Sequence, residues 1–263
     1  MNKIRTIISK EWAEVFKNRF VLFTVAFLPL IMTAIPLVIL FMTRSEQVLN
    51  SLDTEMPAQF SAFCPANLSS GECIQVYVIS NFLVMFMILP LAIPATIASY
   101  SIVGEKVTRS LEPLLATPIT TAELLIGKSL AAALPAILAT WAGFAIFAAG
   151  AWLILAEREV FFAVLDSLWL LAIFLVGPLM AILSVNVSVI VSSRTNDPRV
   201  AEQISMIVIL PLMLVFFGQL AGLFILNNQL ILLSAAALLV VDAILIRLAV
   251  RLFQRETILT RWK

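Results

Sequence analysis

The sequence predicts an all-α membrane protein with six transmembrane helices, an amphipathic interfacial helix before them, and a short cytoplasmic helix between the second and third. Three observations predict this class. Of the 263 residues, 62% are hydrophobic and 13% are charged, whereas soluble globular chains are about 45–50% apolar and about 25% charged. Six runs reach the roughly 20 mostly apolar residues that a transmembrane helix needs. Lysine and arginine gather in alternate connections between these runs. We expect residues 1–263 to form a single transmembrane domain.

Residues 2–19 come first and have the pattern of an amphipathic helix. Its apolar face is predicted to consist of Ile4, Ile8, Trp12, Val15 and Phe16, with lysines and arginines elsewhere. Such a helix is expected to lie in the cytoplasmic membrane interface, with Trp12 at headgroup depth and its cations toward anionic lipid. Its simplest function is to lead the chain into the membrane.

The six apolar runs are predicted at residues 20–43, 76–103, 121–155, 162–191, 198–226 and 229–253. Several are longer than a membrane requires, so these helices are expected to tilt, to project from the membrane or to kink at internal prolines. The prolines concerned are Pro29, Pro36, Pro90, Pro94, Pro135, Pro178 and Pro211. Only Asn227 and Asn228 separate the last two runs, so a count of five spans is the alternative.

The basic residues indicate how the chain is oriented. If the amino terminus is inside, all of the 17 lysines and arginines except Arg44 and Arg158 fall in cytoplasmic segments. This is the distribution that the positive-inside rule describes. Both termini are therefore expected in the cytoplasm, which agrees with an even number of spans.

Residues 44–75 form the one sizeable loop on the outer side and contain both cysteines, Cys64 and Cys73. A disulfide bond between them is the favoured interpretation, because they lie on the oxidising side of the membrane. Two free thiols are the alternative. A metal site is not expected, since the chain has no histidine and two thiolates would need further ligands.

Residues 104–128 read GEKVTRSLEPLLATPITTAELLIGK and form a charged segment between two apolar runs. Its charged residues, which include Glu105, Arg109 and Glu112, exclude the segment from the hydrocarbon of the membrane. Its leucines, Leu111, Leu114 and Leu115, have helical spacing and would form one apolar side of a helix. The Thr117-Pro118 pair is expected to end this helix. Thr120 and Glu123 have the spacing of a capping box that begins the next helix.

The order of these residues resembles the cytoplasmic loop of the type-2 ATP-binding-cassette (ABC) permeases, the transmembrane subunits of many bacterial exporters. The matching motif is Glu105-Lys106, Arg109, Leu111-Glu112, Leu114-Leu115, Thr117-Pro118 and Gly127-Lys128. Pro113 departs from the family pattern, which often has an ordinary helix former there. The resemblance implies that residues 104–120 hold a coupling helix, with Glu105, Arg109, Leu111, Glu112, Leu114 and Leu115 contacting an ATPase, and that the 2–19 helix contacts it too. An amphipathic loop lying on the membrane surface is the alternative.

The same resemblance implies a permease subunit of an ATP-driven exporter in the bacterial inner membrane. A second permease, identical or not, would complete the substrate pathway, and two separate ATPase subunits would bind ATP and magnesium. Membrane lipids are expected contacts; nucleic acid is not, since no basic patch is interleaved with aromatic residues. A secondary transporter or channel subunit would instead favour internal repeats, and a membrane scaffold or assembly factor would need no docking loop.

No enzymatic activity and no cofactor are expected in the chain itself. Residues 122–129 imitate the end of a phosphate-binding loop, but Ala122 replaces its first glycine and no strand precedes it. Without histidine, no Ser/His/Asp or Cys/His set is possible. Lys128 is therefore interpreted as a cation that extends to the membrane interface at the start of the third span.

Four polar residues within the spans are candidates for the substrate pathway: Asn81, Asn186, Gln219 and Asp242. Asp242 is the most costly, because a charged side chain at the centre of a transmembrane helix costs roughly 2.5–3.5 kcal/mol on insertion scales. It either meets a cationic group of a substrate or has a structural partner, for which Arg247, Lys128 and a neighbouring backbone group are the candidates.

Overall fold

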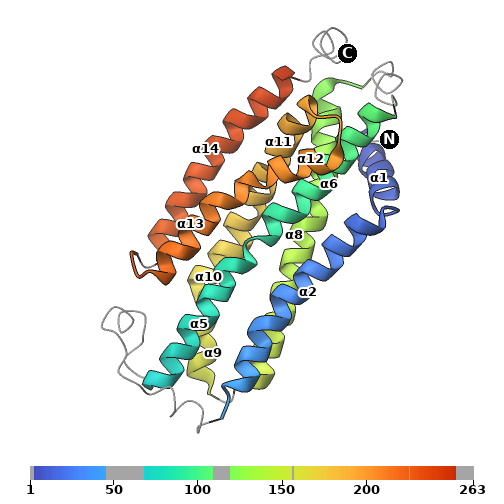
Figure 1. The fold of residues 1–263 in the computed structure, drawn as a ribbon. Coiled ribbons are helices and arrows are strands. Elements are labelled where there is room, and N and C mark those ends of the chain that lie inside the picture. Colours follow the sequence, from blue (N-terminus) through green and yellow to red (C-terminus); the bar gives the residue numbers. More distant parts are fainter. Residues whose placement is uncertain (1–2, 46–67, 109–118, 156, 225, 253–263) are drawn as a thin grey trace.

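The computed structural model describes residues 3–45, 68–108, 119–155, 157–224 and 226–252 (Figure 1). Within these ranges it contains helices and no strand. The helices are α1 (Lys3–Val15), α2 (Arg19–Met42), α5 (Ser70–Phe86), α6 (Leu89–Val107), α8 (Thr121–Ile154), α9 (Arg158–Val164), α10 (Ser167–Leu171), α11 (Gly177–Arg194), α12 (Pro198–Ser205), α13 (Ile209–Leu220) and α14 (Asn228–Leu252). A π-helical turn, η1 (Ala172–Val176), precedes α11, and a 3₁₀ turn, η2 (Met206–Val208), precedes α13.

Six helical segments are long and apolar enough to cross a membrane, which confirms the predicted class. They are Val21–Met42, Ser70–Val107, Ala122–Ile154, Arg158–Arg194, Pro198–Leu220 and Asn228–Leu252. The fifth and sixth spans are separate, so the alternative of five is wrong. The chain turns between them at Gly222, whose φ of 69° lies in the left-handed region that glycine adopts without steric cost.

Three of the spans are interrupted, and in each of them a proline lies in the first turn of the helix that follows one of the interruptions. The second span consists of α5 and α6, with Pro90 in the first turn of α6. The fourth contains α9, α10, η1 and α11, with Pro178 in the first turn of α11, and Pro211 lies in the first turn of α13 in the fifth. A proline in a first turn lacks a backbone N–H that would have no helical acceptor anyway. Pro29, Pro36, Pro94 and Pro135 lie inside continuous helices.

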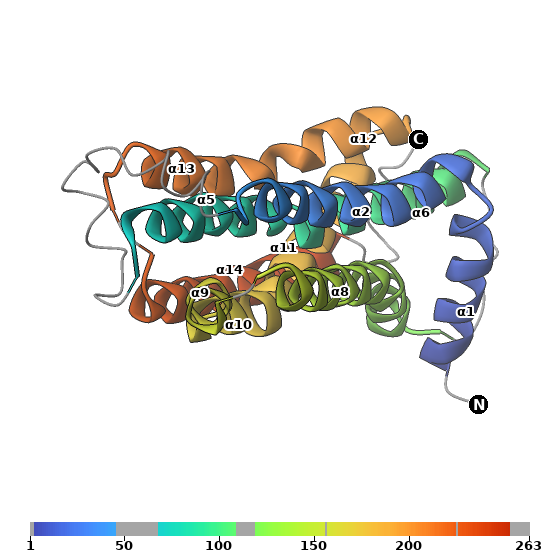
Figure 2. The same ribbon diagram turned by 90° about the horizontal axis from the view of Figure 1, so that it is seen from below.

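Helices α6 and α11 form the centre of the bundle. They pack against each other, with α8 and α12 against α6 and α14 against α11, while α2 covers α8 and α5 (Figures 1 and 2). In the second span 67% of the most apolar stretch is buried, compared with 17% in α14. The second span is therefore a core element, whereas α2, α12, α13 and α14 present apolar side chains to the outside, as a membrane requires.

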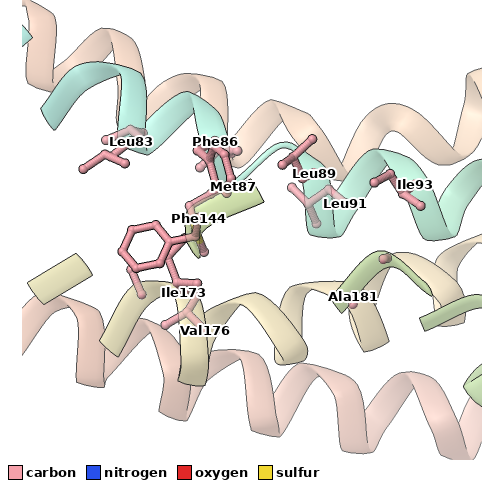
Figure 3. Packing of buried hydrophobic residues seen from close by; sticks show 14 of the residues in the cluster. Leu83, Phe86, Met87, Leu89, Leu91, Ile93, Phe144, Ile173, Val176 and Ala181 are labelled. Atoms are coloured by element: carbon pink, nitrogen blue, oxygen red, sulfur yellow. The ribbon is translucent and has the colours of Figure 1, made fainter. Parts of the chain in front are cut away.

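Figure 3 shows the core between α5–α6 and the η1–α11 segment. Its buried side chains include Leu83, Phe86, Leu89 and Leu91 on one side and Ile173, Val176 and Ala181 on the other, with Phe144 of α8. Close helix approach depends on Gly143 of α8, where an added Cβ would lie 3.0 Å from the Phe86 ring. Gly143 therefore serves packing, as small residues commonly do between membrane helices.

Helix α1 does not run along the bundle but lies across one end of it (Figure 2). The start of α8 and the end of α14 lie at the same end, and α9 lies at the opposite end (Figure 1). An even number of spans places the first and last parts of the chain at the same end of the bundle, as observed. Arg158, which begins α9, stacks its guanidinium 3.6 Å from the centre of the Trp152 ring.

Candidate functional site

The segment predicted to couple to an ATPase begins in the last turn of α6 and leads to the start of α8. Five of its predicted contact residues lie outside the described residues: Arg109, Leu111, Glu112, Leu114 and Leu115. Glu105, the sixth, is in α6. The capping box is confirmed, because the Thr120 hydroxyl accepts from the Glu123 N–H at 3.2 Å and the Glu123 carboxylate accepts from the Thr120 N–H at 2.8 Å.

Four charged side chains meet where α1 crosses α6 and α8, and we call them the ion cluster: Lys10, Glu11, Glu105 and Lys128. The Lys128 ammonium lies 2.7 Å from a carboxylate oxygen of Glu11 and 2.7 Å from one of Glu105. Lys10 pairs with Glu105 and lies 3.8 Å from Glu11. Ser101 of α6 donates to Glu11 and accepts from Lys128 at 3.1 Å. The cluster thereby joins three helices.

Three of the four members of the ion cluster lie out of water, whereas the side chain of Lys10 is 36% exposed at its edge. Glu11, Glu105 and Lys128 are only 2%, 4% and 5% exposed. Charged groups are stable in such a place only when they are paired and hydrogen-bonded, and here two ammonium groups face two carboxylates. Burial lowers the pKa of Lys10, but its hydrogen bond and attraction to Glu105, with smaller contributions from Glu11 and Glu14, outweigh burial and raise its pKa overall.

These contacts correct the interpretation of Lys128. Its ammonium does not extend to the membrane interface but turns inward to Glu11 and Glu105. Glu105 also faces inward, to α1 and α8, from the last turn of α6. Ion pairing explains why both side chains face inward, since each charged group loses its hydration on burial and gains a group of opposite charge instead.

Close packing of α1 on α8 brings the cluster together. A Cβ added at Gly127 would lie 2.8 Å from Cγ2 of Ile7, so only glycine fits at this crossing. The Trp12 indole N–H donates to the Ala131 carbonyl at 2.9 Å, and is therefore used within the protein rather than at a lipid headgroup as expected. Ile7, Glu11 and Val15 form the buried stripe of α1, which shares only Val15 with the predicted apolar face.

The last turn of α6 is also attached to α11. The Lys106 ammonium donates to the carbonyls of Ser193 and Thr195, at 3.3 Å and 3.1 Å, where α11 ends. A cation is favourable there, because the last carbonyls of a helix lack intrahelical donors and carry a partial negative charge. Glu105 and Lys106, neighbours in the predicted motif, therefore fasten the same turn to different elements, Glu105 to α1 and α8 and Lys106 to the end of α11.

The four candidate pathway residues are all buried, and the structure divides them into two pairs. Asn81 donates to the Tyr77 carbonyl at 2.9 Å, and the Tyr77 hydroxyl donates to the Gln219 carbonyl at 3.5 Å, so Asn81 and Gln219 share the contact between α5 and α13. Asn186 and Asp242 face each other between α11 and α14. The structure does not join the two pairs into one polar path.

Asp242 lacks the structural partners proposed for it. Within the described ranges neither of its carboxylate oxygens has a hydrogen-bond partner, and the Asn186 amide nitrogen nearby completes no hydrogen bond either. Lys128 is engaged in the ion cluster, and Arg247 is exposed and forms no ion pair with Asp242. The expected pairing of Asp242 with either cation is therefore wrong for this structure.

The outer loop is described only at its end. Cys73 lies buried in the first turn of α5 and takes part in a disulfide bond. Cys64 lies outside the described residues, so the pairing of the two stays a prediction. Ser69 and Glu72 form a second capping box, with the Ser69 N–H donating to the Glu72 carboxylate at 2.8 Å.

Sequence reasoning missed Glu11, Lys10 and Ser101 as members of the site. One signal was present: Glu11 lies four residues from both Ile7 and Val15, so an acidic residue occupies an apolar helical stripe. A carboxylate in such a position needs a cation from another element. Which cation it finds depends on the fold.

The chain matches the model of the ABC-2 family transporter proteins over residues 5–234, which is most of its length, and it belongs to this family. A search of the curated proteins finds no match. The chain is thus a multi-pass transmembrane component of an ABC transporter, and its family implies association with ABC ATPase subunits. This membership favours a permease over the secondary transporter, channel and scaffold alternatives.

Proposed function

We propose that the chain is the permease subunit of an ATP-driven exporter of the bacterial inner membrane. Two permeases, identical or not, pair around the substrate pathway, and two ATPase subunits bind at the end of the bundle that carries α1. The distribution of lysine and arginine supports a cytoplasmic location for this end and for both termini. ATP and magnesium are bound by the partner.

The ion cluster is the observation that carries this proposal. Glu105 precedes residues 109–118 and Lys128 follows them, yet their side chains lie 2.7 Å apart. The end of α6 and the start of α8, which flank this segment, are thereby held together, and Glu11 fastens α1 to both helices. A push on the segment would move α1 and the adjoining ends of α6 and α8 as one body. Because α6 packs on α11, the displacement would reach the centre of the bundle.

The predicted contact residues take two roles in this proposal. Arg109, Leu111, Glu112, Leu114 and Leu115 touch the ATPase. Glu105 acts instead as a positioning residue, since it is buried against Lys10 and Lys128. The apolar side of the segment supplies docking area, because leucines at helical spacing otherwise remain in water.

Purification of the permease with its ATPase tests the docking role. Leu114→Asp combined with Leu115→Asp should release the ATPase, because two carboxylates would be desolvated in an apolar contact. The control is Leu223→Asp, which changes a 78% exposed leucine in the turn between α13 and α14, at the other end of the bundle (Figure 1). An unchanged ratio of ATPase to permease in the double variant, with full coupled ATP hydrolysis, would refute the assignment.

A further inference from the structure

The fourth span is interrupted near its middle by the π-helical turn η1, which lies between α10 and α11. The Gly177 N–H donates to the Ala172 carbonyl, five residues back. The next residue is Pro178, in the first turn of α11, and proline has no N–H to donate. The Ile173 carbonyl therefore lacks both donors that a helix could supply, since its α-helical donor would be Gly177 and its π-helical donor would be Pro178.

A side chain of the third span replaces the missing donor. The Trp141 indole N–H of α8 donates to the Ile173 carbonyl at 3.3 Å, and the ring centres of Trp141 and Phe174 lie 5.4 Å apart. A free backbone carbonyl is costly between membrane helices, where no water can pair with it. Trp141 thus completes the hydrogen bonding of the π turn. In an uninterrupted α-helix Ile173 would not need this donor, because Gly177 would supply it.

The π turn separates two parts of the fourth span that have different neighbours. On one side α9 packs against α5, and α10 is joined to the start of α14 by a hydrogen bond from Asn228 to Ser167 at 3.1 Å. On the other side α11 packs chiefly against α6. One face of the turn is loosely packed, because a Cβ added at Gly177 would meet only the Ala172 carbonyl, at 3.7 Å, and Phe174 is 50% exposed. The angle at this turn can therefore change without a clash on that face.

We propose that η1 is the hinge of the fourth span and that Trp141 is the positioning residue that keeps the hinge closed. With the indole hydrogen bond made, α9 and α10 keep the angle to α11 that the structure shows. When the bond breaks, the turn is held by fewer hydrogen bonds than the helices on either side, and α9 and α10 swing relative to α11. A proline, a π-helical turn and a side chain bonded to the backbone each cause kinks in helices, and all three coincide here. The motion belongs to the chain itself and requires neither an ATPase nor a cargo.

The first test uses the full chain in lipid nanodiscs and compares Trp141→Phe with the unsubstituted protein. Phenylalanine keeps an aromatic ring beside the turn but has no N–H. Hydrogen–deuterium exchange with mass spectrometry should show residues 172–177 exchanging roughly three- to tenfold faster, the effect of one lost hydrogen bond. Trp152→Phe is the matched control, because it changes a tryptophan of the same helix whose ring stacks on Arg158. It should leave exchange at the π turn unchanged.

A second substitution separates control of the hinge from a general loss of packing. Pro178→Ala supplies the N–H that the Ile173 carbonyl needs within its own helix. Trp141→Phe combined with Pro178→Ala should therefore exchange as slowly as the unsubstituted chain. Pro94→Ala is the control, since it adds an N–H inside α6 and should not reverse the effect of Trp141→Phe.

Paired spin labels measure the swing itself. Phe162→Cys in α9 and Met42→Cys at the end of α2, 63% and 68% exposed, place both labels at the end of the bundle that carries α9 (Figure 1). Their distance distribution should broaden or gain a second component in Trp141→Phe and return to the original in the double variant. Labels at Lys17→Cys and Arg194→Cys, both exposed residues, serve as the control pair and should not respond. The chain without engineered cysteines measures the background.

Three results would overturn the proposal. The first is unchanged exchange at the π turn in Trp141→Phe. The second is faster exchange that Pro178→Ala does not reverse, because the missing N–H would then not be the cause. The third is faster exchange with an unchanged label distance, which would mean that the hydrogen bond stabilises the turn without controlling an angle.

Discussion

Lys128 binds two carboxylates that come from different helices, Glu11 of α1 and Glu105 of α6. Such a residue stabilises the fold less by the net strength of its ion pairs than by preventing two buried negative charges from facing each other. Replacing a whole buried ionic set by apolar groups is often neutral, whereas removing one partner is strongly destabilising. The ion cluster is therefore stable only when all of its charged side chains are present, because removing one of them leaves a buried charge without its partner.

Lys128→Met should lower the free energy of unfolding by about 3–5 kcal/mol, because it leaves Glu11 and Glu105 without their shared cation. Adding Glu105→Gln should restore part of this loss, since Lys10 and Glu11 then remain as a balanced pair. Thermal and denaturant unfolding of the purified variants measures the change. Lys17→Met, which removes an exposed lysine near the end of α1, is the control and should have almost no effect. If the losses of unfolding free energy caused by Lys128→Met and Glu105→Gln simply added in the double variant, the two residues would not interact as the ion cluster requires.

The ion cluster also shows what a sequence reveals about single residues. Each charged member is visible in the sequence, but Lys10 and Glu105 are 95 positions apart and Glu11 and Lys128 are 117 apart. No local pattern brings such residues together, because their meeting depends on how α1 turns across the bundle. The position of Asn186 opposite Asp242 escapes local reasoning for the same reason.

The crossing of α1 and α8 is the element-scale feature on which the cluster depends. Gly127 lets the two helices approach, and Ile7 of α1 fills the space that a side chain would occupy. The contact cannot yield easily, since Cβ of Ile7, at the root of its side chain, lies 3.0 Å from the added Cβ. Thus a glycine that the sequence shows only as part of a family motif has a specific packing role.

Gly127→Ala should destabilise the protein by about 1–3 kcal/mol through overpacking. Gly104→Ala is a matched control in α6, because nothing lies within 4 Å of an added Cβ there; it should be neutral or stabilising by up to about 1 kcal/mol, since alanine favours the helix. Ile7→Ala combined with Gly127→Ala should recover much of the loss. Equal melting temperatures for the two single alanine variants would rule out the close contact.

The helices themselves were largely predictable, because the sequence patterns that mark them are local. The apolar runs mark the six spans, and the Thr120–Glu123 spacing marks the start of α8. The interrupted helices were less predictable, since a proline marks an interruption at Pro90 but lies inside a continuous helix at Pro94. Neighbouring helices decide between these outcomes by satisfying the freed carbonyls.

At the scale of the whole molecule, α1, the start of α8 and the end of α14 share one end of the bundle, and the turn between α13 and α14 lies at the other (Figure 1). The basic residues predict that the first of these ends is cytoplasmic. The four candidate pathway residues do not form one line through the bundle, which agrees with the proposal that a second permease completes the pathway.

Orientation is open to a direct test with engineered cysteines and a thiol reagent that does not cross membranes. Leu223→Cys, in the exposed turn after α13, should react in intact right-side-out vesicles. Lys17→Cys, at the α1 end, should react only in inverted vesicles, because the positive-inside rule places that end in the cytoplasm. The unsubstituted chain measures the background. Reaction in the reverse pattern would show that the basic residues have been misread.

The interruption between α5 and α6 divides the most buried span into two rods with different attachments. The rod nearer α1 is fastened to the ion cluster and to the end of α11, while the other packs against α13. Between them the helix is carried by short turns, with Met87 bonded to Val84 and Ile88 to Met85, and Pro90 offers no N–H to reinforce the joint. Bending therefore concentrates there. We therefore expect a force on the ion cluster to change the angle between the two rods more readily than it shifts the whole span along its axis.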